Sequence, residues 1–79
     1  MSESLVALHL PNAVEVQTQK LLRQIELAHT ADDLFRASDR AAGFVLGLET
    51  VNVLNATSIE GLYKTFEAAA TARRQEHEQ

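Results

Sequence analysis

Residues Thr30 to Glu76 read TADDLFRASDRAAGFVLGLETVNVLNATSIEGLYKTFEAAATARRQE. This stretch holds two segments rich in Ala, Leu and other helix-favouring residues, separated by the polar turn Asn55-Ala56-Thr57. In each segment apolar residues recur at intervals of three and four, which is the spacing of one helix face. Because a short turn places consecutive helices antiparallel, the stretch predicts a helical hairpin.

The segment 31–54 is the predicted long central helix. Thr30 followed by Asp33 is typical of an N-cap, and Asn55 suits the left-handed residue just past the helix end. Two adjacent apolar stripes run along it: Leu34, Ala41, Val45 and Leu48 form the first, and Phe35, Ala42, Leu46 and Val53 form the second. Since its second half is almost wholly apolar, we expect that half to be buried.

The segment 58–76 is the predicted second helix of the hairpin. Thr57 with Glu60 matches a capping box at its start. Its apolar stripe comprises Ile59, Leu62, Tyr63, Phe66, Ala69 and Ala70, all expected in the core. The mixed-charge tail from Arg73 to Gln79 is expected to fray, with Arg73 and Arg74 complementing the dipole of the helix end.

The segment 12–29 predicts a third helix packed on this hairpin. Asn12 suits its N-cap, with Glu15 three residues on. Its apolar stripe comprises Val14, Leu21, Leu22, Ile25 and Ala28. Residues 1–11 form an arm that Pro11 ends, and its alternating apolar residues fit a strand, although a short helix fits too. A strand there would pair with the arm of a second copy or lie extended in a groove.

Length and composition favour association. A chain of 79 residues buries a small core, and without Cys it has neither disulfides nor thiolate zinc sites to stabilise it. A homodimer is the commonest remaining source of stability. We therefore expect an all-α fold of three helices with a long central helical hairpin and an N-terminal extended arm, assembled as a dimer.

The charge balance limits the kinds of molecule that this chain is expected to bind. Seven basic and eleven acidic residues give a net charge of −4, which disfavours binding through phosphate neutralisation. No apolar run reaches the ~20 residues of a membrane span, and the start at Met1 lacks a basic signal-peptide region. We therefore expect a cytoplasmic protein that binds neither membranes nor, in the main, nucleic acid.

No pattern predicts chemistry. His9, His29 and His77 fall on the arm, a turn and the tail, and none has an acid or nucleophile at relay or metal-site spacing. Asp32 and Asp33 fit a helix start better than a catalytic pair. We expect no catalytic residue, no metal site and no cofactor.

Two features are candidates for an interaction surface. Gly43 and Gly47 lie one turn apart in the central helix, where each costs about 1 kcal/mol relative to Ala. Such a pair is explained if a neighbouring backbone approaches closely, either a helix of the same chain or a partner. The second candidate is the arm, whose large apolar residues Leu5, Val6, Leu8 and Leu10 would be unusual in a solvated tail.

The run from Ala41 to Glu49, the turn, Ile59 to Tyr63 and Ala69 to Arg73 together resemble small helical-hairpin proteins encoded by bacteriophage and prophage accessory genes. The resemblance implies a non-enzymatic protein that binds and inhibits a bacterial host protein, such as a transcription regulator, a pilus motor or a defence complex. Two alternatives stay open. One is a nucleic-acid-associated regulator of divergent ribbon-helix-helix type, although the arm offers few base-reading side chains. The other is a structural assembly subunit.

Overall fold

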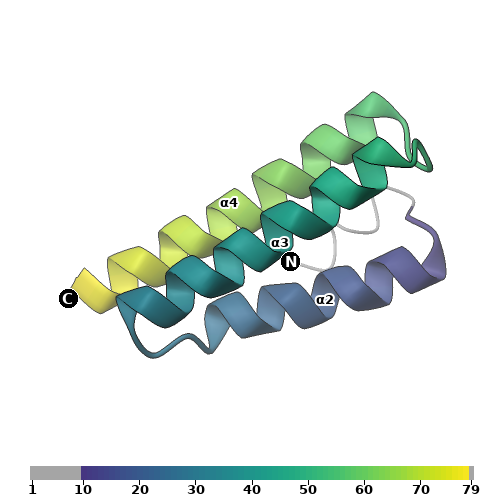
Figure 1. Ribbon diagram of the computed structural model, residues 1–79. Coiled ribbons are helices and arrows are strands. Elements are labelled where there is room, and N and C mark those ends of the chain that lie inside the picture. The colour runs from purple at the N-terminus through teal and green to yellow at the C-terminus, as the bar shows by residue number, and fades with distance from the viewer. Residues whose placement is uncertain (1–9, 79) are drawn as a thin grey trace.

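The computed structural model describes residues 10–78, and within them the chain forms three helices and no strand. These helices are α2 (Asn12–Glu26), α3 (Ala31–Thr50) and α4 (Ala56–Glu78). Figure 1 shows α3 and α4 running antiparallel along their whole length, with α2 laid along the same hairpin. The predicted all-helical class and helical hairpin are thus confirmed. The predicted strand-like arm lies outside the described residues, apart from Leu10 and Pro11.

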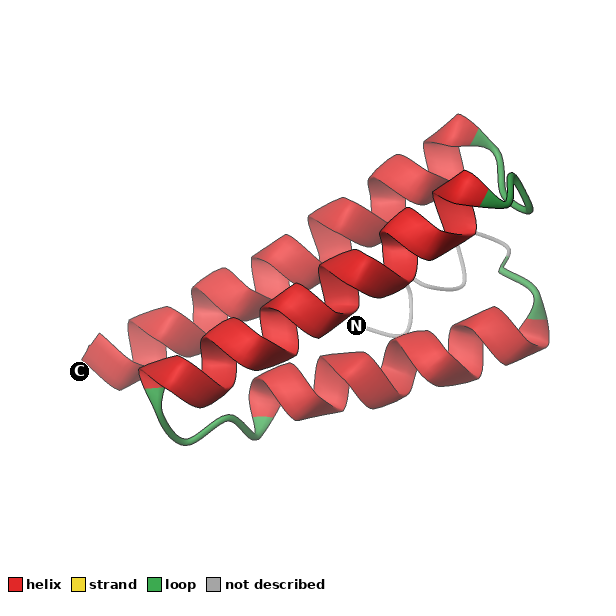
Figure 2. Ribbon diagram, viewed as in Figure 1, coloured by secondary structure: helices red, strands yellow, loops and turns green. Residues whose placement is uncertain are grey.

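Loops join the helices at opposite ends of the bundle, as Figure 2 shows in green. The first loop ends at Thr30, whose side-chain oxygen accepts a hydrogen bond from the Asp33 backbone N–H at 3.0 Å. This is the predicted N-cap. At the start of α2, by contrast, Asn12 lies inside the helix and makes no side-chain cap. Pro11 takes the cap position there, and its carbonyl accepts from the Glu15 N–H at 2.9 Å.

The turn between α3 and α4 differs from the prediction. The central helix ends at Thr50, four residues before the predicted end, and Asn52 rather than Asn55 adopts the left-handed conformation, with φ of 58°. Asn tolerates that conformation better than the β-branched residues beside it. Asn55 instead caps α4, because its side-chain oxygen accepts from the Ser58 N–H at 2.8 Å. Thr57, the predicted cap, therefore lies in the first turn of α4.

The core lies where α2 meets the hairpin. From α2 it takes Leu21, Leu22 and Ile25, all of which are fully buried. The remaining buried apolar side chains are Ala28, Leu34, Ala37, Ala41, Val45, Ile59, Leu62 and Phe66. Leu34, Ala41 and Val45 of the first stripe and Ile59, Leu62 and Phe66 of the α4 stripe thus form the core as predicted, with Leu48, Ala69 and Ala70 partly buried against it. The prediction that Tyr63 lies in the core is wrong, because this side chain is 36% exposed on the face of α4 that lines the pockets. The buried Thr18 was not predicted, and its hydroxyl is satisfied by donating to the Val14 carbonyl at 2.7 Å.

The second stripe of the central helix is exposed. The expectation that the whole second half of this helix is buried is therefore wrong for Leu46 and Val53, although Val45 in the same half is buried. Phe35 is 70% exposed, Leu46 57% and Val53 55%. The reason is geometric. A single helix, α2, packs against the hairpin on the side of Leu34, Ala41 and Val45, so the adjacent stripe faces away from it.

Neighbouring residues of α3 therefore give a sharp test of the packing. Val45 is 0% exposed and Leu46 57% exposed, although both are apolar. We expect Val45→Asp to abolish cooperative unfolding, because an unpaired buried carboxylate costs several kcal/mol. We expect Leu46→Asp to keep the helical circular dichroism of the parent chain. Loss of helical signal in both variants, or in neither, would contradict this packing.

Candidate interaction surface

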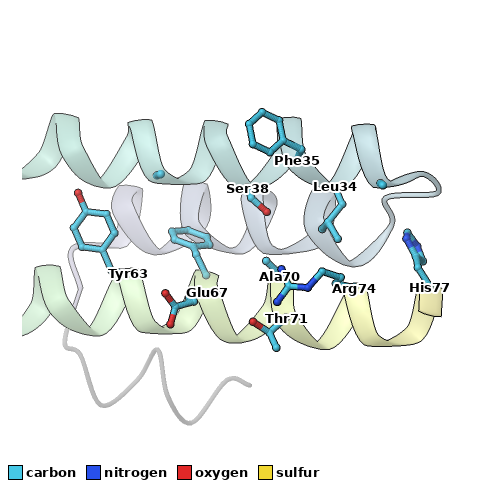
Figure 3. A pocket seen from close by; sticks show the side chains of 12 residues that line it. Leu34, Phe35, Ser38, Tyr63, Glu67, Ala70, Thr71, Arg74 and His77 are labelled. Carbon is cyan, nitrogen blue, oxygen red and sulfur yellow. The ribbon is translucent and has the colours of Figure 1, made fainter. Parts of the chain in front are cut away.

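A groove runs between α3 and α4, and all of its lining residues belong to these two helices (Figure 3). Its volume is about 940 Å³. The apolar part of its wall is made by Ala31, Leu34, Phe35, Ala42, Tyr63, Phe66 and Ala70. Among these lining residues, Phe35 and Tyr63 are large side chains that lie outside the core and are 70% and 36% exposed. The groove is thus a mainly apolar surface on which side chains remain accessible.

Charged side chains lie at both ends of the groove and in its middle. Arg74 and His77 line one end, where α4 finishes beside the start of α3, and Figure 3 shows Arg74 extending along the groove. Glu67 lines its middle. At the other end Tyr63 also lines a second, smaller pocket together with Glu49 and Glu60. The surface is therefore positive at one end and negative at the other.

The predicted glycine pair lies on an exposed face of α3, next to Leu46 and away from the core. A Cβ built at Gly43 or at Gly47 meets no atom within 4 Å. The interpretation that a helix of the same chain approaches closely here is therefore wrong among the described residues. We call Gly43 and Gly47 the glycine ridge. A contact of this ridge with a partner stays a prediction.

The predicted residues of the arm divide in two. Leu5, Val6 and Leu8 lie outside the described residues. Leu10 is half-buried and packs against the hydrophobic core, so it contributes to the fold rather than to a free surface. The structure does not bring the arm residues and the glycine ridge together as one described site.

The last turns of α4 hold the C-terminal end of α2. The backbone carbonyl of Ala28 accepts a hydrogen bond from Arg73 Nε at 2.9 Å, and His77 Nε2 lies 3.0 Å from the same oxygen. Positive charge at this position complements the negative end of the α2 dipole. The tail predicted to fray is thus helical as far as Glu78, and Arg73 serves α2 rather than the end of its own helix.

The acidic, histidine and buried polar side chains of the described residues bear on the predicted absence of a metal site. Among residues 10–78 no three His, Asp or Glu side chains gather where they could hold a metal ion. In the same range no buried side-chain nitrogen or oxygen lacks a hydrogen-bond partner. His77 contacts a backbone carbonyl, and His29 is exposed in the loop before α3. None of the helices within 10–78 is both long enough and apolar enough to cross a membrane.

Sequence reasoning missed the groove. Phe35, Ala42, Tyr63 and Arg74 were not among the candidate residues, although all four line it. The pattern that could have found it is the second apolar stripe of the central helix. A single further helix can bury only one of the two apolar stripes of the central helix, so the other stripe stays exposed.

Comparisons with protein-family models, with curated proteins and with solved structures found no significant match.

The contact at Ala28 generates a prediction with a matched control. Replacing Arg73 by Ala removes the Nε donor from a buried carbonyl, and we expect the free energy of unfolding to fall by about 1–3 kcal/mol. Replacing the nearby exposed Gln75 by Ala should change it by less than about 0.5 kcal/mol. Urea denaturation followed by circular dichroism measures both. Equal effects of the two substitutions would refute the stabilising role of Arg73.

Proposed function

We propose that this chain is a small, non-enzymatic, cytoplasmic protein-binding module. It pairs with a second copy of itself and modulates, most simply inhibits, a bacterial host protein. Phage-type accessory proteins of the helical-hairpin kind, which the sequence resembles, act in this way. The observation that carries the proposal is the exposed face of α3, where Leu46 is 57% exposed between the bare backbone positions Gly43 and Gly47.

An exposed face of this kind is unusual in a chain that acts alone. Contiguous apolar surface on a small protein marks a place where another molecule binds. Glycines in the interior of an exposed helix reduce its stability without any packing gain inside the chain. Their gain would come from a partner whose backbone or side chains approach closely over the glycine ridge. The arm residues Leu5, Val6, Leu8 and Leu10 are a second candidate surface for the same partner.

The alternatives fit the surface less well. A nucleic-acid binder needs a basic face, whereas this chain carries a net charge of −4, and its groove combines Arg74 with Glu67. A purely structural subunit would use its exposed faces for self-association alone.

A capture experiment with paired variants tests the proposal. The tagged chain is incubated with nuclease-treated bacterial lysate, and bound proteins are identified by mass spectrometry. We expect one stoichiometric partner for the parent chain. Gly43→Arg combined with Gly47→Arg should lose it, because two long side chains then cover the glycine ridge. The same double change should keep or raise the melting temperature, since each replaced Gly costs about 1 kcal/mol in a helix interior.

The control is Gln19→Arg, a charge added to an exposed position of α2. This variant should retain the partner at the parent level. Equal recovery by the glycine-ridge variant would contradict a binding role for this face. A partner that is recovered from untreated lysate but not from the nuclease-treated lysate would instead favour the nucleic-acid alternative.

A further inference from the structure

The floor of the groove differs in character from its edges. Figure 3 shows Leu34 and Ser38 of α3 and Ala70 of α4 between the two helices. In the same view Phe35 stands at the outer edge of α3, and Glu67 stands at the outer edge of α4. The carboxylate of Glu67 therefore belongs to the rim of the groove, and the floor between the helices is mainly apolar.

Ring side chains lie at the two ends of this floor. Tyr63 lies at one end and His77 at the other (Figure 3). Tyr63 and Ala70 are seven residues apart on α4, which corresponds to about 10 Å at about 1.5 Å per residue. The groove volume of about 940 Å³ lies within the roughly 300–1,000 Å³ of pockets that take small organic molecules. The groove thus has the dimensions of a small-ligand site.

One arginine in the groove has no partner among the side chains that the structure describes. The other three arginines of α3 and α4 all donate hydrogen bonds, namely Arg36, Arg40 and Arg73. Arg74 takes part in no hydrogen bond and no ion pair of the described residues. Figure 3 shows its side chain extending along the groove toward Ala70, which lies one helical turn away. A guanidinium group with free donors therefore borders an apolar floor.

We propose that this groove binds a free aliphatic carboxylate, an anion of the fatty-acid type. Its carboxylate accepts hydrogen bonds from Arg74, because the planar fork of guanidinium donors matches the two carboxylate oxygens. Its hydrocarbon chain runs from there along the floor toward Tyr63, where apolar surface of both partners leaves water. This site is separate from the glycine ridge, and it requires neither the proposed host partner nor self-association.

The rim favours a slender ligand over a helix of another protein. An α-helix with its side chains is about 10–12 Å wide. A helix laid in the groove would therefore cover the rim as well as the floor, and it would bury Glu67 and Thr71 against its own apolar face. A hydrocarbon chain lies on the floor alone and leaves the rim in water. An anion also matches the sign of the charge that Arg74 brings to the floor.

Two probes with the same tail and opposite charge test the site by calorimetric titration of the full chain. Decanoate should bind about tenfold more tightly than decyltrimethylammonium, both below their micelle concentrations. Unspecific binding to a chain with a net charge of −4 would give the opposite order. Hexanoate should bind at least about tenfold more weakly than decanoate, because fewer methylene groups leave water. These comparisons use the unaltered chain, so they do not depend on the folding of any variant.

A pair of arginine substitutions then locates the carboxylate. Arg74→Gln should raise the decanoate Kd about fivefold, the effect of losing an exposed ion pair. Arg23→Gln on α2 is the matched control, because Arg23 is also exposed and its side chain also has no described partner. This control should change the Kd less than about twofold. In amide NMR spectra decanoate should shift the signals of Ser38 and Tyr63 and leave that of Gln19 on α2 unchanged.

Equal affinity for the two probes, or equal effects of the two arginine substitutions, would overturn the proposal. Decanoate-dependent shifts confined to residues outside the groove would do the same. If neither probe binds and the groove signals shift instead when the chain is concentrated, a second copy occupies the groove and the proposal fails. None of these results alters the test of host-protein capture through the glycine ridge.

Discussion

The packing of α2 on the α3–α4 hairpin is the interaction on which the rest of the structure depends. Leu21, Leu22 and Ile25 enter the hairpin from one side and are at most 1% exposed. Burying each such side chain contributes about 1.5–3 kcal/mol. The contact between α2 and the hairpin is therefore the main stabilising contact of a very small core. Just past the C-terminal end of α2, the Ala28 carbonyl accepts a hydrogen bond from Arg73 of α4, which attaches this end of α2 to the hairpin. The fold is therefore stabilised from one side of a two-helix layer.

A layer covered on one side leaves its other side free. No described residue of α2 lines the groove on that side. Phe35 is accessible in the groove, and Leu46 is exposed elsewhere on α3. The sequence nevertheless has large apolar residues on the exposed face of α3, and two glycines lie on the same helix beside them. Both choices reduce the stability or solubility of an isolated chain, and both are explained if the working form is an assembly.

Much of the fold could be predicted from local patterns. The apolar spacing of Leu34, Ala41 and Val45 identified the buried face of the central helix, and Thr30 identified its start. The capping residue of α4 could not be chosen in the same way, because Asn55 and Thr57 are both good N-caps, and the early end of α3 decides between them. Exposure of the second stripe was missed for a related reason. Periodicity shows which residues share a face, but the number of helices available to cover that face is a property of the whole chain.

Two leucines allow the central proposal, that a second copy covers the exposed face of α3 around Leu46 in solution, to be tested directly. Leu27 at the end of α2 is 58% exposed and Leu46 on α3 is 57% exposed in the single chain. A soluble paramagnetic agent attenuates methyl NMR signals according to their accessibility. At high protein concentration we expect Leu46 to be attenuated much less than Leu27, with the difference disappearing on dilution. Equal attenuation of the two leucines at every concentration would contradict the claim.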